Sequence, residues 1–247
     1  MLLNPKYNHL HEWLLRLPQD FEHLGKVIYD KRNQLRVITA PDGTLVNAKR
    51  YCKAHPLNRV VYSMGIRQPK GRRAFLYPAL LQQRGIDTPE PIAYIEERRC
   101  GLLGLSYLVS VQSRLGHTLF EFSHAQEGTY EQMAHAVGCF IAMMHEREVL
   151  HLDLSSGNIL WDKDEQGYHF AVVDINRLRF GKVSMQDGCA TLCRLWGPKR
   201  FTELVVRSYA TARGLDQEQA VRLTMQARTA YWTRFMRRHS VEFPLEL

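Results

Sequence analysis

The sequence predicts an α+β fold in two parts, and three observations support this. Short segments with strand-like alternation fill residues 27–112, whereas apolar residues recur with helical spacing after residue 130. A pair of strand-like segments within 157–173 interrupts the helical half. We therefore expect an N-terminal part over 1–112, with a leading helix, an antiparallel sheet and one inserted helix. A mostly helical part is expected over 113–247.

The N-terminal part begins with a helix and continues as a sheet. Apolar residues at positions 10, 13, 14 and 17 predict a short helix over 9–17, and Pro18 is expected to end it. A second helix is expected over about 72–84. Five segments alternate like strands, and they cover residues 27–29, 35–39, 45–49, 92–96 and 105–112. This order places one helix between the third and fourth of these strands.

The C-terminal part contains the clearest helical pattern of the chain, over 130–148. Apolar residues recur there at i, i+4, i+7, i+8 and i+11 from Met133, which is typical of a helix with one buried face. Two more helices are expected near the end of the chain, around 201–213 and 216–239, with Gly214 between them.

Composition and charge exclude several classes of protein. The 247 residues are 45% hydrophobic, enough for a sizeable core, and the five scattered cysteines form neither a disulfide framework nor paired zinc motifs. No apolar run is long enough to span a membrane, and the first residues do not resemble a secretory signal, so we expect a cytoplasmic protein.

The positive charge of the chain indicates an anionic partner. The formal net charge is +8, and no acidic residue occurs between Asp42 and Asp87. The basic residues of this interval are at positions 49, 50, 53, 59, 67, 70, 72, 73 and 84. An ordinary solvated face explains this charge equally well. We do not expect nucleic acid as the partner, because no winged-helix, zinc-finger or aromatic-platform motif accompanies the charge.

Polar residues in the order of a phosphoryl-transfer site follow the 130–148 helix. His151 and Asp153 precede Asn158, and Asp174 ends the second strand of the expected hairpin over 157–173. The hairpin would bring Asn158 and Asp174 together as oxygen ligands for Mg²⁺. Asp153 would orient the attacking hydroxyl and accept its proton. Each residue alone could be a turn or cap residue, but their order favours the catalytic interpretation. We expect His151 to be structural and to hydrogen-bond the loop.

The segments 151–158 and 174–177 together resemble the lipopolysaccharide kinase family, which includes the Kdo and heptose kinases of Gram-negative bacteria. Further matches lie at 31–33, 72–74 and 85–91, and the resemblance covers roughly residues 25–235. It implies a two-lobed protein-kinase-like fold, ATP and Mg²⁺ as cofactors, and a sugar hydroxyl of the lipopolysaccharide core as acceptor. The enzyme would then be a phosphotransferase with an alcohol group as acceptor. A small-molecule phosphotransferase of the aminoglycoside or choline type shares the same loop arrangement.

The resemblance also assigns phosphate-binding residues in the N-terminal part. Lys49 resembles the lysine that holds the α- and β-phosphates, with Lys53 as an alternative. Lys31 and Arg32, between the first two strands, would contact phosphate where a glycine-rich loop is missing, unless they form an ordinary polar turn.

One element of the kinase pattern is missing. The helix glutamate that normally pairs with the phosphate-binding lysine is replaced by an apolar position near Leu76, and Glu90 is the nearest substitute. The missing glutamate leaves a second interpretation, a pseudokinase that binds nucleotide or glycan without turnover.

The expected terminal helix combines apolar and basic residues. Its apolar positions are 221, 225, 232, 235 and 236, and its arginines are at 222, 228, 234, 237 and 238. This profile is compatible with peripheral contact between the helix and an anionic membrane, such as the inner face of the inner membrane. Packing of the helix on its own lobe is the alternative.

Overall fold

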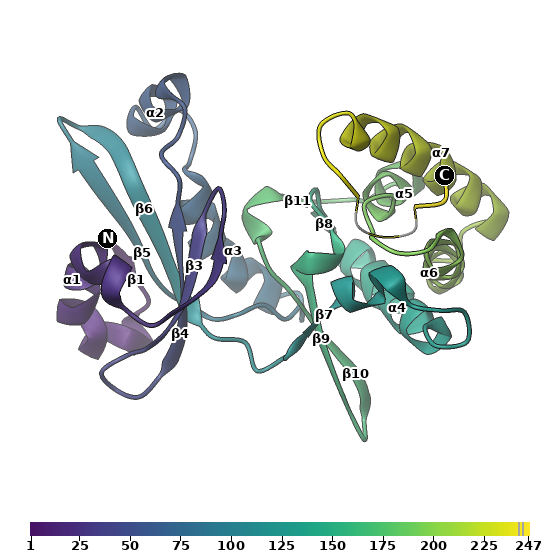
Figure 1. Cartoon of the computed structure of the whole chain (residues 1–247), viewed down its shortest axis with the longest axis horizontal. Coiled ribbons are helices and arrows are strands. Elements are labelled where there is room, and N and C mark those ends of the chain that lie inside the picture. Colours follow the sequence, from purple (N-terminus) through teal and green to yellow (C-terminus); the bar gives the residue numbers. More distant parts are fainter. Residues whose placement is uncertain (242, 244) are drawn as a thin grey trace. The chain divides into compact units, whose positions relative to one another are not determined.

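The computed structural model describes residues 1–241, 243 and 245–247, and it divides into two compact units (Figure 1). The first unit comprises Met1–Gln83 and Thr88–Arg114, and the second comprises Arg84–Asp87 and Leu115–Leu247. The first is built on an antiparallel sheet and the second is mostly helical, so the predicted α+β class is confirmed. Within the described ranges, no helix has both the length and the apolar character needed to cross a bilayer.

Six strands form the sheet of the first unit, in the order β1-β5-β6-β4-β3-β2. Each neighbouring pair is antiparallel. The strands are β1 (Leu2–Leu3), β2 (Lys26–Asp30), β3 (Gln34–Thr39), β4 (Leu45–Tyr51), β5 (Pro91–Arg99) and β6 (Leu102–Val111). The five strands predicted from alternation are all present, and only β1 is too short to show a pattern.

A helix packs on one face of this sheet through apolar side chains. Val46 and Ala48 of β4 point to this face and are fully buried. The helix is α1 (His11–Asp20), which follows the short 3₁₀ helix η1 (Pro5–Leu10) and leads into η2 (Phe21–His23). The expectation that Pro18 ends the helix is wrong, because Pro18 lies inside α1. Proline removes one backbone hydrogen bond there, but the buried Leu14 and Leu17 hold the helix against the sheet.

The opposite face of the sheet carries α3 (Lys70–Gln82). The helix α3 lies closest to the sheet at Gly71, where a Cβ atom would lie 2.4 Å from the Tyr94 ring and 2.9 Å from the Tyr51 ring. Because alternate residues of a strand share a face, Lys49 of β4 lies on the same face as Tyr51. A further helix, α2 (Pro56–Ser63), was not predicted from the sequence.

In the described residues of the second unit there are four helices and two small sheets. The helices are α4 (Glu131–Glu146), α5 (Met185–Leu192), α6 (Lys199–Ala212) and α7 (Gln217–Met236). One sheet has the order β10-β9-β7, with strands β7 (His117–Thr118), β9 (Ile159–Asp164) and β10 (Gly167–Val172). The other pairs β8 (Val149–His151) with β11 (Leu178–Phe180). Short 3₁₀ helices η3 (Leu119–His124), η4 (Ser156–Asn158) and η5 (Ile175–Arg177) connect them.

The helix α4 packs against α6 and against the strands β8 and β10. Its predicted apolar face is buried from Met133 to Met144, which confirms that pattern. It packs closely on α6, because a Cβ atom on Gly138 would lie 2.5 Å from the backbone oxygen of Val205. The chain leaves α4 through β8, and the polar residues predicted to be functional follow directly.

Candidate functional site

His151 ties the polar loop to the end of the hairpin. It ends β8, is fully buried, and faces Leu178 of β11 in the strand register. Its Nδ1 accepts a hydrogen bond from the Asp153 backbone N–H at 3.1 Å. Its Nε2 therefore carries the proton and donates to the Val173 oxygen at 3.1 Å. Burial lowers the pKa of His151, so the ring is neutral and acts as the structural link that was predicted.

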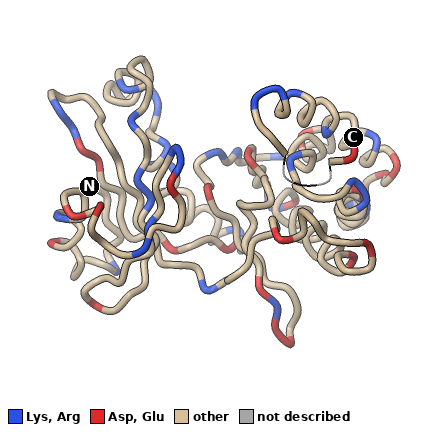
Figure 2. Tube along the Cα trace, viewed as in Figure 1, with Lys and Arg blue, Asp and Glu red and all other residues tan. Residues whose placement is uncertain are grey.

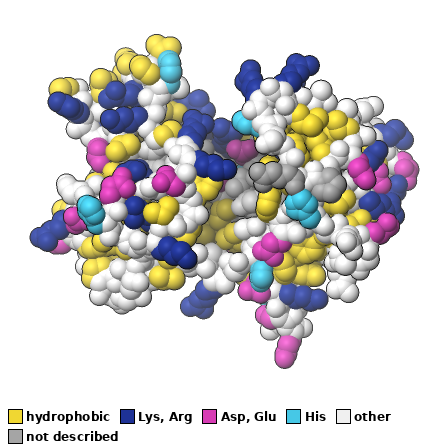
Figure 3. Space-filling view, viewed as in Figure 1, with side chains coloured by type: hydrophobic (Ala, Val, Ile, Leu, Met, Phe, Trp, Pro, Cys, Tyr) yellow, Lys and Arg dark blue, Asp and Glu magenta, His cyan; other side chains and the backbone are white. Residues whose placement is uncertain are grey.

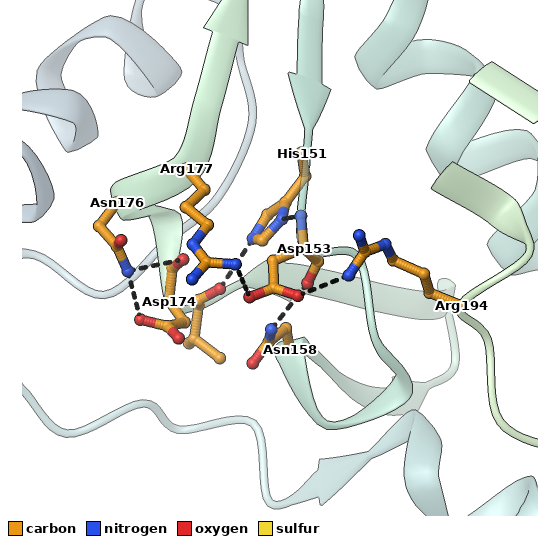
Figure 4. A network of polar contacts seen from close by, with 8 residues as sticks. His151, Asp153, Asn158, Asp174, Asn176, Arg177 and Arg194 are labelled. Atoms are coloured by element: carbon orange, nitrogen blue, oxygen red, sulfur yellow. Dashed lines mark hydrogen bonds and ion pairs between the residues drawn. The ribbon is translucent and has the colours of Figure 1, made fainter. Parts of the chain in front are cut away.

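Two arginines orient the carboxylate of Asp153 (Figure 4). Its Oδ2 accepts from Nη1 of Arg177 at 3.1 Å, and its Oδ1 accepts from Nη1 of Arg194 at 3.1 Å. The Asp153 side chain remains 30% exposed, so the carboxylate is held but open to solvent. Two further hydrogen bonds fix the backbone of Asp153. Its carbonyl oxygen accepts from Asn158 Nδ2 and from the Ser155 N–H, both at 2.8 Å.

The β9–β10 hairpin brings Asn158 and Asp174 to the same end of the sheet. The two strands pair from Gly167↔Asp164 to Val172↔Ile159, and the Val173 N–H then donates to the Asn158 oxygen at 3.0 Å. Asp174 follows directly, in a left-handed conformation with φ of 53°. Its Oδ1 accepts from Asn176 Nδ2 at 2.7 Å, and this bond supports the unusual backbone.

The oxygen atoms of these two side chains fit a hard divalent cation. Because Nδ2 of Asn158 is used in the bond to Asp153, its Oδ1 is the atom left for a cation. Asp174 adds a carboxylate, and Mg²⁺ commonly takes one or two such protein ligands together with phosphate oxygens and water.

Residues 193–197 carry Arg194 and are fixed from two sides. Ser156, in the loop after Asp153, accepts from the Trp196 N–H at 2.8 Å through its Oγ and donates to the Trp196 oxygen at 3.3 Å. From α7, Trp232 Nε1 donates to the Cys193 oxygen at 3.0 Å. The Arg194 guanidinium also lies 4.9 Å from the centre of the Tyr231 ring, within cation–π distance.

Arg228 contradicts the expected profile of α7. It was expected on an exposed basic face, but it is only 1% exposed. Its Nη1 donates to the Leu195 oxygen at 3.1 Å and its Nη2 to the Gly197 oxygen at 2.8 Å. Burial lowers the pKa of Arg228 to about 10, so the group remains a cation near neutral pH. Arg228 therefore supports residues 193–197, which we call the Arg194 segment.

The phosphate-binding candidates Lys49, Lys31 and Arg32 lie in the first unit. Lys49 is half-buried in β4, between Leu35 of β3 and Leu108 of β6, and its Nζ lies 5.2 Å from the centre of the Tyr51 ring. Lys31 and Arg32 are exposed in the turn between β2 and β3, and the alternative Lys53 is exposed just after β4.

Glu90 does not act as the expected substitute for the helix glutamate. Its Oε2 accepts from Lys6 Nζ at 2.8 Å and from the Tyr7 hydroxyl at 2.9 Å. Because these bonds engage the carboxylate, Glu90 is committed to the N-terminal segment. The helix α3 itself contains no acidic residue.

The sequence model of the Lipopolysaccharide kinase (Kdo/WaaP) family matches residues 29–187, which is more than half of the chain. The chain belongs to this family. The match includes His151, Asp153, Asn158 and Asp174 of the second unit and Lys49 of the first. None of the curated proteins matches the chain.

Solved structures show the fold of this Kdo/WaaP family member. The structure of WaaP in complex with acyl carrier protein is 18% identical, with a TM-score of 0.58, and the alignment covers 96% of this chain and 98% of that one. Amicoumacin kinase hAmiN, in complex with AMP-PNP, Ca²⁺ and Ami, is 12% identical with a TM-score of 0.57, over 95% of this chain and 89% of that one. The predicted protein-kinase-like fold is therefore confirmed.

Two residues that contact or support the Asp153 loop of this family member could not be found from the sequence. Arg194 lies 41 positions after Asp153, and no periodicity connects the two. Arg228 shares its helix with exposed arginines and cannot be told apart from them by type. The sequence signal for the burial of Arg228 was the apolar Trp232 one turn later on the helix. In the structure both side chains are buried on this side of α7.

Proposed function

We propose that the chain is an ATP- and Mg²⁺-dependent kinase that phosphorylates a sugar hydroxyl. The proposed acceptor is Kdo or heptose of the lipopolysaccharide core, or a related glycan. The observation that carries the proposal is one hydrogen-bonded loop that holds Asp153 and Asn158 and joins them to the segment ending in Asp174. Membership of a kinase family supports the same conclusion.

In this mechanism Asp153 is the catalytic base. Its carboxylate would accept a hydrogen bond from the acceptor hydroxyl and take its proton as the phosphoryl group is transferred. The contacts with Arg177 and Arg194 fix the direction of both carboxylate oxygens, so the acceptor would meet an oriented base. The remaining exposure of Asp153 leaves room for that approach.

Asn158 and Asp174 are the proposed metal ligands. Mg²⁺, when bound, neutralises charge on the transferred phosphate. The ladder of β9 and β10 holds both ligands in register, and the Asn176 bond keeps the Asp174 carboxylate in one orientation.

Lys49 is the proposed anchor for the α- and β-phosphates, and Lys31 and Arg32 the proposed contacts at the strand turn. The helix α3 offers no carboxylate for this lysine, and Glu90 is engaged by Lys6 and Tyr7. We place the reaction in the cytoplasm, where ATP is available, with peripheral contact to an anionic membrane that would present a glycolipid acceptor.

The binding of ATP with Mg²⁺ is the first test. In a thermal-shift measurement, ATP with Mg²⁺ should raise the melting temperature of the full chain, and Asp174→Ala should abolish the Mg²⁺-dependent part. Asp162→Ala is the matched control, because Asp162 lies on the same hairpin and should leave the shift intact. Failure of millimolar ATP to stabilise a folded protein would contradict the proposal. Transfer of labelled phosphate to Kdo- or heptose-containing core oligosaccharides, compared with aminoglycosides, identifies the acceptor.

A pseudokinase is the second candidate, and the absence of acidic residues from α3 favours it. Asp153→Asn separates the two functions. A kinase should lose turnover by several orders of magnitude in this variant and keep its ATP-dependent thermal shift. A pseudokinase would show ATP binding in both proteins and phosphate transfer in neither.

A further inference from the structure

One side of α2 exposes a group of large apolar side chains. Leu57, Val60 and Met64 are 74%, 45% and 69% exposed, and Ile66, just after the helix, is 69% exposed. Positions 57, 60 and 64 follow the i, i+3, i+7 spacing that places side chains on one helix face. We call these four residues the α2 patch. Figure 3 shows hydrophobic side chains gathered over α2 at this end of the first unit.

The opposite side of α2 is anchored to β6. Arg59 Nε donates to the Leu103 oxygen at 2.8 Å, and the Leu103 N–H donates to Ser63 Oγ at 2.9 Å. Tyr62 is buried on the same side. These contacts fix the rotation of α2 about its axis. The α2 patch, on the other side of the helix, is therefore held facing the solvent. Large apolar groups that are both exposed and fixed commonly mark an interaction surface.

Basic residues surround the α2 patch. Lys53 and His55 precede the helix, Arg67 follows it, and all three are exposed. Arg99, also exposed, lies at the turn between β5 and β6, and β6 is the strand on which α2 packs. Figure 2 shows blue segments beside α2 and at the tip of the β5–β6 hairpin. No acidic residue lies between Asp42 and Asp87, so the part of this surface formed by Lys53, His55 and Arg67 attracts anions, whereas Arg98 on the hairpin is paired with Glu96 at 2.7 Å.

We propose that the α2 patch inserts into the surface of an anionic lipid bilayer. Apolar side chains would enter the region between headgroups and acyl chains, while the surrounding cations meet lipid phosphates. A protein partner fits less well, because a stable protein interface takes about 800 Å² from each side, and two turns of helix supply much less. The inference gives a surface to the membrane contact proposed above, and it does not require catalytic activity.

The terminal helix is a weaker candidate for this contact. The apolar Trp232 of α7 is fully buried, and Arg228 is turned inward to backbone oxygens. Met236 is the one apolar residue from its expected stripe that is clearly exposed, at 44%. Two residues of the expected amphipathic surface, Trp232 and Arg228, are therefore used for packing within the second unit, which leaves α7 with less exposed apolar surface than the α2 patch.

Co-sedimentation with lipid vesicles tests the proposal. The full chain should bind vesicles that contain phosphatidylglycerol, bind pure phosphatidylcholine at least tenfold more weakly, and lose binding as salt is raised. The double variant Leu57→Gln/Met64→Gln should reduce binding to phosphatidylglycerol vesicles at least tenfold. Leu45→Gln, an exposed apolar residue in the same unit, and Met236→Gln on α7 are the matched controls and should bind as the original protein does.

Two results would overturn the proposal. One is failure of the original protein to bind phosphatidylglycerol vesicles, and the other is equal binding by the double variant. If the double variant instead lost binding to a purified acidic protein such as an acyl carrier protein, with vesicle binding unchanged, the patch would be a protein-docking surface. The thermal shift with ATP and Mg²⁺ is measured on every variant, so that failure of membrane binding is distinguished from failure of the proposed kinase activity.

Discussion

Nη1 of Arg194 donates to Oδ1 of Asp153 at 3.1 Å, from a position 41 residues further along the chain. Together with Arg177 on the other oxygen, it leaves the carboxylate little rotational freedom. The orientation of the proposed base is therefore set by residues outside the loop that contains it.

Arg194→Met should lower kcat by about 10- to 100-fold, because a base that is free to rotate spends less time aligned with the acceptor hydroxyl. The KM for ATP should stay close to its original value. Arg200→Met is the control, since Arg200 is 51% exposed and pairs with Glu203, which lies outside the Asp153 loop. Steady-state kinetics check both variants, and an unchanged kcat in Arg194→Met would refute the positioning role.

Arg228→Met should lower the free energy of unfolding by about 2 kcal/mol, because the buried oxygens of Leu195 and Gly197 lose their donor. It should also lower kcat through the loosened Arg194 segment. Arg222→Met, at an exposed position of the same helix, should change neither quantity. Urea denaturation followed by circular dichroism measures the stability. A variant as stable as the original protein would show that the two hydrogen bonds only offset the cost of burying the guanidinium.

Gly71→Ala should destabilise the first unit by about 1–3 kcal/mol, because the new methyl group would overlap the Tyr94 ring. Helix propensity opposes this effect, since alanine is favoured over glycine in helices by about 1 kcal/mol. A net loss would show that the steric overlap dominates. Gly116→Ala serves as the comparison, because nothing lies within 4 Å of its Cβ position. A gain in thermal stability for Gly71→Ala would contradict the close packing of α3.

Acid should destabilise the second unit through His145. Burial, with Arg213 and Arg179 nearby, lowers its pKa to about 3, although Asp187 acts in the opposite direction. In the unfolded chain the group takes up a proton near pH 6.5, so its stabilising contribution is complete above that pH and is lost as the pH falls toward 3. The expected slope is about 1.4 kcal/mol per pH unit.

His151, whose pKa burial also lowers, adds to this acid sensitivity. His145→Gln should therefore make the dependence shallower without removing it. Denaturation midpoints between pH 4 and 7 provide the measurement. If His145→Gln and the original protein lost stability in parallel, protonation of His145 would not contribute to the loss.

Local patterns explain which features the sequence could predict. The β9–β10 hairpin is visible as two strand-like segments around a polar run, and the buried face of α4 is visible from its spacing. These are interactions between residues close in the chain. Pro18 is different, because the proline predicts a helix end, whereas the burial of Leu14 and Leu17 outweighs its lost hydrogen bond.

Features of the site that depend on distant contacts could not be predicted. Residue type places Arg228 with the surface arginines, and only the position of the Leu195 and Gly197 oxygens explains its burial. The α2 patch was not predicted either, because a helix of eight residues spans little more than two turns, which is too short for its apolar spacing to indicate a helix. The site residues in the Asp153 loop could be proposed from their order alone, but the arginines that orient them could not.

The distance between Asn158 and Asp174 is set by the pairing of β9 with β10, and not by the number of residues between the two. The tip of the hairpin at residues 165–166 lies outside the ladder, so we expect extra residues there to leave both proposed ligands in place. Removing a single residue from β9 or β10 would instead exchange the inner and outer faces of that strand beyond the deletion. The tip, about 20 Å along the strands from Asn158 and Asp174, is thus a place where we expect a peptide tag or a spectroscopic reporter to leave the proposed site undisturbed.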